Sequence, residues 1–348
     1  MDRYIGLDVH AQTTTIVVMT SKGKHVSERV VETHGKVIVE AISAVAGTLH
    51  VCLEEGMHAE WIHELLLGRV AEVVVMIPPE RSGPKNDSRD AWWLADQLRL
   101  GVPQKKVFKG TMSSLREAVR GYDALTKHST RSKLQLRFLA RGRGLDVERS
   151  QLLKKEERDE LIAQLPPPRQ LRANLHARLL DSVQGLRDEA LAQLQKETKK
   201  NADVRRLMEV PGLGPIRSAQ IVATVITPHR FRTRQQFWSY CGLAVVTRSS
   251  SDWRPRDGKM VRKDKVLTRG LLPGNPTLKC AFKAAAKDVV KHYPKHPWAV
   301  AFQRAVDDGK KSNLAMLTLA RKIAETVLHI WKHKEAYDQS KHKSQDAA

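Results

Sequence analysis

Cysteine is scarce in this sequence, and long hydrophobic runs are missing from it. The three cysteines, Cys52, Cys241 and Cys280, stand far apart and make no pair with metal-ligand spacing. A disulfide framework and a cysteine-based zinc site are therefore not expected. No apolar run approaches the ~20 residues that a membrane span needs, and no signal-peptide pattern opens the chain. These absences predict a protein of a reducing cytoplasm with no membrane partner.

Negative charge is also in short supply relative to positive charge. Lysine and arginine number 60 against 38 aspartates and glutamates, which leaves a formal net charge of +22. A surplus of this size attracts polyanions and speeds encounters with them, so nucleic acid is the first expected partner. A basic membrane-surface protein is the alternative, but no segment has the matching amphipathic anchor.

The order of local patterns predicts three regions and a tail. Residues 1–108 alternate strand-like and helix-like runs, which is typical of an α/β domain, and YIGLDVH and TTTIVVMT open it as a hairpin. Residues 109–200 lose the strands and read as a helical, coiled-coil linker and dimerisation region. Residues 201–338 are mainly helical, and 339–348 form a loose tail.

The helix expected after the three prolines at 166–168 carries apolar residues at three- and four-residue steps. These are Leu171, Leu175, Leu179, Val183, Leu186, Ala190 and Leu194. They form one apolar stripe, along which two helices of one chain or two copies of the same helix can pack. An ordinary helical hairpin and a dimerising coiled coil are equally compatible with this pattern.

Two other features suit contact with nucleic acid. The helix expected from Leu115 to Arg143 is rich in cations, which are Arg116, Arg120, Lys127, Arg131, Lys133, Arg137 and Arg141. In VPGLGPIRSAQIVATV, Gly212 and Gly214 allow a tight turn of helix-hairpin-helix type, where exposed amides can meet phosphate without base selectivity. A solvated helix face and a plain glycine-rich connector are the structural alternatives.

Four carboxylates stand where a purely structural role is hard to find. Asp8 lies inside the first strand, and Glu54 ends the apolar run LHVCLE, while Glu55 points to the other face by strand alternation. Asp87 and Asp90 share one side of a helix start, although either alone would serve as a cap. Converging like charges repel unless cations lie between them. Together the four predict a divalent-metal site, with two Mg²⁺ ions suited to phosphodiester chemistry.

A second candidate site lies in FWSYCGLAVVTRSSSDWRPRDGK. Three serines, Ser249 to Ser251, precede Arg254 and Arg256. A hydroxyl held among cations can attack a phosphate whose developing charge the cations stabilise. The alternative is a polar loop, and no His–Asp relay stands at a recognisable spacing from these serines.

The order GLDVH, CLEEG and KNDSRDAWWLAD resembles the Asp-Glu-Asp-Asp (DEDD) domain of insertion-sequence transposases. More narrowly it resembles the family numbered one hundred and ten, whose relatives include the Piv-type invertases. The likeness continues through WSYCGL, RSSS and PGNPTLKCAF. It implies a RuvC-like (RNase-H-type) domain in which Asp8, Glu54, Asp87 and Asp90 bind Mg²⁺, followed by a C-terminal transposase domain. The family's nucleophilic serine falls on Ser250, and Ser251, which replaces the family's glycine, is the second choice.

The resemblance implies a site-specific recombinase that cuts and rejoins donor and target DNA. It implies a covalent phosphoserine link, a non-coding bridge RNA that selects both DNAs, and a homodimer or homotetramer. The basic helix would then bind the RNA backbone. The expected setting is the nucleoid of a bacterium or archaeon.

Three other functions are compatible with the same residues. A RuvC-like structure-specific endonuclease would cleave without the serines and form no adduct with DNA. A Piv-type invertase would recombine DNA without RNA. A non-catalytic nucleic-acid-binding protein would need neither the acids nor metal.

Overall fold

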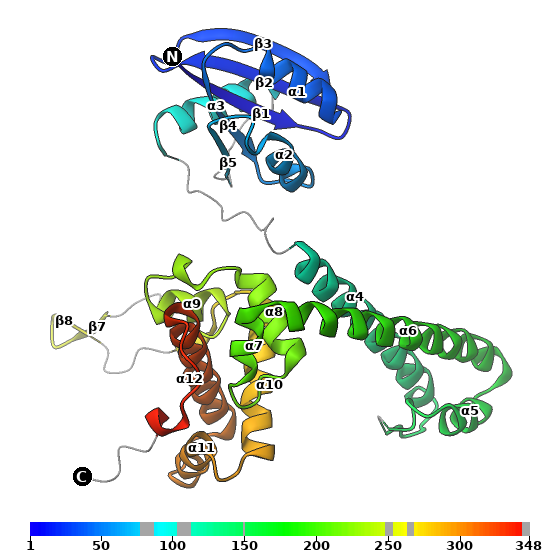
Figure 1. Ribbon diagram of the computed structural model, residues 1–348. Coiled ribbons are helices and arrows are strands. Elements are labelled where there is room, and N and C mark those ends of the chain that lie inside the picture. The colour runs from blue at the N-terminus through cyan, green and yellow to red at the C-terminus, as the bar shows by residue number, and fades with distance from the viewer. Residues whose placement is uncertain (77–86, 103–112, 149, 248–252, 263–267, 343–348) are drawn as a thin grey trace. The chain divides into compact units, whose positions relative to one another are not determined.

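The strand-like runs near the N-terminus form one five-stranded mixed sheet (Figure 1). This computed structural model describes residues 1–76, 87–102, 113–148, 150–247, 253–262 and 268–342. The chain divides into two compact units, Met1–Thr111 and Met112–Ala348. An α/β N-terminal part followed by a mainly helical remainder is confirmed.

The strand order in the sheet is β3-β2-β1-β4-β5. The strands are β1 (Asp2–Val9), β2 (Thr13–Thr20), β3 (His25–Glu32), β4 (Thr48–Glu54) and β5 (Glu72–Met76). The β1–β2 hairpin is confirmed, and β3 extends it as an antiparallel edge strand. On the other side β1, β4 and β5 run parallel, so helices α1 (Gly35–Ser43) and α2 (Ala59–Leu66) make the crossovers. The sequence reasoning missed β3 because its side chains are mostly exposed and polar.

Strand alternation gives the sheet two apolar faces. On one face Leu7 and Leu53 pack with Ile38 of α1 and Ile62 of α2. On the other face, Cys52, Val74 and Met76 pack with Leu94 and Leu98 of α3 (Asp87–Arg99). The face that carries α3 is the one that matters for the candidate site.

The second unit begins with an antiparallel pair of long helices, α4 (Ser113–Arg141) and α6 (Pro167–Lys200) (Figure 1). A short helix, α5 (Lys155–Ala163), closes the far end. Leu136, Leu139 and Ala140 of α4 share a core with Ala173 and Ala177 of α6. Both long helices were expected from the sequence, and the small residues let the two backbones approach closely.

The predicted stripe on α6 is not the surface that packs on α4. Leu171, Leu175, Leu179 and Leu186 are 49–69% exposed, whereas Val183 and Leu194 are buried. At 100° per residue, Leu171 and Leu175 lie on the side of α6 opposite Ala173 and Ala177. The prediction of one continuous packing stripe is therefore wrong within the chain, because Ala173, Ala177 and Leu180 of α6 share a core with α4, and the four exposed leucines do not. The four leucines form an outward face, called the leucine face below.

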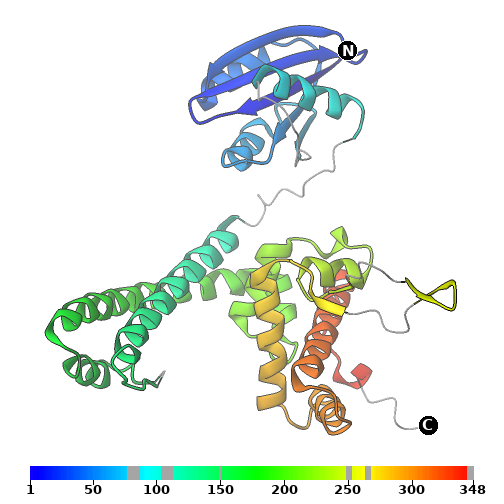
Figure 2. The same ribbon diagram turned by 180° about the vertical axis from the view of Figure 1, so that it is seen from behind.

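The rest of the second unit is built on one large core. Its helices are α7 (Ala202–Met208), α8 (Pro215–Val225), α9 (Arg234–Tyr240), α10 (Pro276–His292), α11 (Pro297–Asp307) and α12 (Ser312–His333). Phe237, Phe282 and Trp298 are fully buried there, and Leu115 and Leu194 join the base of the α4–α6 pair to it. Figure 2 shows α10 and α12 side by side.

Two short antiparallel pairs, which the sequence did not indicate, complete the second unit. They are β6 (Val245–Thr247) with β9 (Thr268–Leu271), and β7 (Trp253–Arg256) with β8 (Lys259–Arg262). No helix in the described part of the chain combines the length and the hydropathy that a membrane crossing requires.

Candidate metal centre and nucleic-acid interfaces

The strand register places two of the predicted acids next to each other. Leu7 of β1 pairs with Leu53 of β4 in parallel register, so the residues that follow, Asp8 and Glu54, come side by side. By alternation both belong to the face that carries α3, because Leu7 and Leu53 belong to the opposite face. Glu54 is the last residue of β4, and Glu55 lies just beyond the strand.

Helix α3 brings the other two acids toward Asp8. Asp87 is its first residue, and Asp90 lies in the same first turn. Both carboxylates act electrostatically on Asp8. The close approach depends on Gly6, because a Cβ there would lie 1.8 Å from the carbonyl oxygen of Ala91. A glycine two residues before Asp8 thus allows the helix to rest directly on β1.

A histidine that the sequence reasoning did not select lies between two of the acids. His10 Nε2 is 3.3 Å from Asp8 Oδ2 and 3.3 Å from Asp87 Oδ1. One ligand atom from each of these three side chains lies within 4.8 Å of the others. Glu54 and Asp90 are not part of this triple. The sequence does contain a signal that could have identified His10, because it follows Asp8 by two residues in GLDVH and alternate residues of a strand share a face.

The environment of Asp8 disfavours its negative charge. Asp8 is only 8% exposed, and burial raises the pKa of its carboxyl above the ordinary value. His10 opposes this shift in pKa, while Asp87 and Asp90 add to it through charge repulsion. A divalent cation among these groups would relieve the repulsion, and carboxylate oxygens are the ligands that Mg²⁺ prefers. The residues present therefore fit a divalent-metal site.

Six of the seven lysines and arginines of α4 divide into two sets, and Arg141 is the last residue of the helix. At 100° per residue, Arg116, Arg120, Lys127 and Arg131 fall within about 60° of the helix circumference. Arg120, Lys127 and Arg131 are exposed, and Arg120 pairs with Glu117 at 2.7 Å. Lys133 and Arg137 are half-buried and turned toward the flank of the helix pair. The first four are called the basic stripe below.

The two glycines of the predicted hairpin have different surroundings. Gly212 has a φ of +82°, and a Cβ there would lie 2.4 Å from the carbonyl oxygen of Ala285, so this glycine is needed for packing on α10. Gly214 is exposed at the start of α8, with open space around it. Arg217 Nη1 donates to the Gly212 carbonyl at 2.7 Å and to Asp288.

A hollow of about 420 Å³ adjoins this turn. Its wall includes Gly212, Gly214, Arg217 and His292. Gly214 is the more exposed of the two predicted glycines, and both line this hollow.

Ser250, Ser251 and their neighbour Ser249 lie outside the described residues. Arg254 and Arg256 belong to β7, whose backbone alone is described. The two ends of the serine-bearing segment, however, meet in the described structure. Gly242 and Gly274 touch so closely that a Cβ on Gly274 would lie 2.3 Å from the Gly242 nitrogen. Asn275 N also donates to Tyr240 O at 2.8 Å. The CGL and PGN sequences therefore close the base of this segment.

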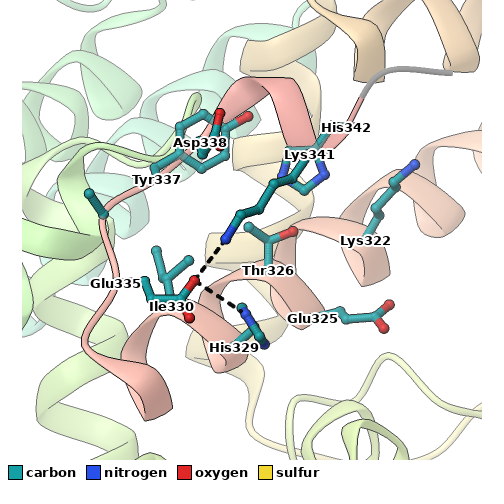
Figure 3. Close-up of a pocket in the computed structure, with 11 residues that line it drawn as sticks. Lys322, Glu325, Thr326, His329, Ile330, Glu335, Tyr337, Asp338, Lys341 and His342 are labelled. Carbon is teal, nitrogen blue, oxygen red and sulfur yellow. Dashed lines mark hydrogen bonds and ion pairs between the residues drawn. The ribbon is translucent and has the colours of Figure 1, made fainter.

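A pocket of about 330 Å³ lies between the end of α12 and the residues that follow it (Figure 3). Glu335 Oε2 is 2.9 Å from Lys341 Nζ and 3.5 Å from His329 Nε2, so this carboxylate already has a cationic partner in Lys341. None of the site residues predicted from the sequence is among those that line it.

Two family models match long parts of the chain. The DEDD transposase model of the IS110 type matches residues 5–142, and the Transposase IS116/IS110/IS902 family model matches residues 204–300. The chain belongs to the IS110 family of transposases. The first match contains all four predicted acids and His10. The second contains the Gly212–Gly214 turn and the serine segment.

Two curated relatives agree with this assignment. The transposase for insertion sequence element IS1111A of Coxiella burnetii is 24% identical over 275 residues, covering 75% of this chain and 70% of that protein. A probable family 20 transposase of Pseudomonas aeruginosa is 31% identical over 80 residues, 23% of each chain. As an IS110-family transposase, the chain is an enzyme of DNA transposition.

Proposed function

We propose that this transposase cuts and rejoins DNA at a Mg²⁺ centre formed by Asp8, Glu54, Asp87 and Asp90, in a RuvC-like domain. The observation that carries the proposal is the approach of Asp87 and Asp90 of α3 to Asp8 of β1, with Glu54 of β4 on the same face of the sheet by strand register. The mixed order β3-β2-β1-β4-β5, with an antiparallel hairpin beside a parallel pair, supports the RNase-H-type assignment.

The fold of the protein keeps the carboxylates of this centre close together. Burial and α3 keep Asp8 close to Asp87, so the unfavourable repulsion among the acids is present before any ligand arrives. Mg²⁺ bound there, in one or two ions, would stabilise charge on the phosphate and lower the pKa of an attacking hydroxyl. Exposed Glu54 and Asp87 leave the centre open to a DNA backbone.

We infer that Ser250 is the nucleophile, with Ser251 as the second choice. Its Oγ forms a bond to phosphorus, the bond from phosphorus to the departing strand's oxygen breaks, and the proton of the serine hydroxyl is transferred to that oxygen. That strand leaves as a free hydroxyl, and the other end stays as a phosphoserine ester. The closed base at Gly242 and Gly274 supports this role, because it ties the serine segment to the helical core. Arg254 and Arg256 are proposed to offset the charge on the phosphate.

A bridge RNA is proposed to select donor and target DNA, and the basic stripe with Lys133 and Arg137 is proposed to bind its backbone. The exposure of Arg120, Lys127 and Arg131 along one side of α4 supports this role. The Gly212–Gly214 turn is proposed as a helix-hairpin-helix contact to DNA phosphate. A homodimer or homotetramer is proposed to form through the leucine face, since exposed leucines in a row are typical of helix–helix interfaces.

One experiment separates this proposal from its rivals. RNA that co-purifies with the full chain is sequenced, and recombination of donor and target DNA is then measured with and without that RNA. Recombination that needs both RNA and Mg²⁺, and that Asp8→Asn abolishes, is the expected result. Recombination without RNA would favour the Piv-type invertase, and cleavage without rejoining would favour the structure-specific endonuclease.

A further inference from the structure

His10 occupies a position that hydrogen bonding alone does not satisfy. Its Nε2 lies 3.3 Å from a carboxylate oxygen of Asp8 and 3.3 Å from one of Asp87. One ring nitrogen carries either one hydrogen or one lone pair, so it cannot donate fully to both acids at once. Charge-assisted hydrogen bonds of this type usually measure about 2.7–2.9 Å, and both distances are longer.

The same distances suit three ligands around one shared cation. Metal–ligand distances of about 2.0–2.2 Å put neighbouring ligands of an octahedral ion roughly 3.0 Å apart. The two nitrogen–oxygen distances need to shorten by only a few tenths of an ångström to reach that spacing, and all three ligand atoms lie within 4.8 Å of one another. His10 is 52% exposed at its side chain, so solvent or substrate oxygens retain access to the centre.

The backbone of His10 is also held in place, although it lies in the turn between β1 and β2. Its N–H donates to the Thr13 carbonyl at 2.9 Å. Its carbonyl accepts from Thr33 Oγ1 at 2.9 Å, and that hydroxyl is 2.9 Å from Thr14 Oγ1. Two strands therefore fix the point from which the ring reaches Asp8 and Asp87.

We propose that His10 is a nitrogen ligand of the metal centre and makes the centre favour Mn²⁺ over Mg²⁺. The inference rests on the proposed metal centre and adds a ligand to it. Mn²⁺ shares the preference of Mg²⁺ for oxygen ligands, but as a transition metal it also accepts an imidazole nitrogen, whereas Mg²⁺ is bound mainly by oxygen. A centre made of carboxylates alone would discriminate less between the two ions.

The test uses Mn²⁺ as the probe on the full chain, without DNA or turnover. Electron spin-echo spectroscopy of bound Mn²⁺ is expected to show coupling to a ¹⁴N nucleus, which histidine labelled with ¹⁵N replaces by ¹⁵N coupling. His10→Ala should remove that coupling and weaken Mn²⁺ binding roughly tenfold or more, with a smaller effect on Mg²⁺ binding. The control is His25→Ala, an exposed histidine on β3 of the same sheet, which should change neither quantity.

The results distinguish this inference from the proposed function. Mn²⁺ that binds the unmodified protein without nitrogen coupling, or with the same coupling in His10→Ala, would overturn the role of His10 and leave the carboxylate centre standing. Failure of Mn²⁺ and Mg²⁺ to bind at all, in a chain that is folded by circular dichroism, would overturn both.

Discussion

Gly6 decides how closely α3 can approach the sheet. The carbonyl of Ala91 occupies the space that a Cβ on Gly6 would need, and the first turn of the same helix carries Asp87 and Asp90. A larger residue at this position would push α3 away from β1. The spacing of the acids therefore depends on a residue that has no side chain.

Gly6→Ala is expected to lower the free energy of unfolding by about 1–3 kcal/mol, the usual cost of overpacking. It should also weaken Mn²⁺ binding, because Asp87 moves away from Asp8. Urea denaturation and metal titration measure the two effects. Gly56→Ala is the control, since a Cβ there meets nothing within 4 Å. Equal stability of the two variants would contradict this account.

Asp8 is expected to destabilise the metal-free protein at neutral pH. Its pKa in the folded state is raised above the ordinary value of an aspartate, mainly by burial. Because the folded state favours the protonated carboxyl, the destabilisation caused by the charged form of Asp8 is fully present at pH values above its folded-state pKa. It is lost as pH falls below the unfolded pKa.

Asp8→Asn should therefore melt at a higher temperature than the unmodified protein at pH 7 without metal, and this difference should shrink toward pH 4. Adding Mg²⁺ should raise the melting temperature of the unmodified protein and leave that of the variant nearly unchanged. Thermal melts across pH, with and without Mg²⁺, measure both effects. A variant less stable than the unmodified protein at pH 7 would show that Asp8 has favourable partners in place of repulsive ones.

At the scale of single elements, α4 offers a test of RNA binding. The basic stripe presents Lys127 and Arg131 to solvent on one side of the helix. Changing both to glutamine should reduce the salt slope of RNA binding by roughly 1.4, about 0.7 for each lost phosphate contact. Filter binding at several salt concentrations measures the slope.

Two comparisons sharpen this prediction. Lys22→Gln with Lys24→Gln removes the same charge from an exposed turn and should leave the slope unchanged. Lys133→Gln with Arg137→Gln should change the salt slope less than the substitutions at Lys127 and Arg131 do, because Lys133 and Arg137 are half-buried. If all variants show the same salt slope, the basic stripe does not bind RNA and is only a solvated surface of the helix.

The leucine face of α6 gives a second prediction at this scale. Leu171→Asp with Leu175→Asp should weaken self-association roughly 100-fold or more, since each buried leucine contributes about 1.5–3 kcal/mol. Light scattering over a range of protein concentrations measures the change. Leu67→Asp alters an equally exposed leucine elsewhere and should have no effect. A dimer that survives the double substitution would mean that another surface joins the subunits.

At the scale of the whole molecule, the proposed covalent step combines residues from both units of the chain. Ser250→Ala should bind RNA and DNA normally yet leave no protein attached to a DNA end on denaturing gels. Asp90→Asn should also lose the adduct, although its serines are intact, because activation of the hydroxyl depends on the acids. Ser249→Ala is the matched control. An adduct that persists in both Ser250→Ala and Ser251→Ala would contradict the serine mechanism.

Local pattern was a reliable guide where a segment's own periodicity decides its structure. The long helices α4 and α6, the β1–β2 hairpin and the buried strands β4 and β5 were all expected from the sequence. Short or polar elements, such as β3 and β6–β9, carry too weak a pattern to be recognised. The predicted domain boundaries stay predictions, as do the roles of the acids and serines.

The sequence by itself determined the family, through motifs that stay recognisable whatever their spatial arrangement, and the strongly basic character that favours nucleic acid. Only the tertiary structure decided which groups meet. It placed Glu54 beside Asp8 through strand register, brought His10 between Asp8 and Asp87, and turned the leucines of α6 outward. Periodicity states which residues share a face of an element. Which of those faces another element packs against depends on contacts between segments that are distant in the sequence, such as Gly6 with Ala91. The sequence of one segment alone does not determine such contacts.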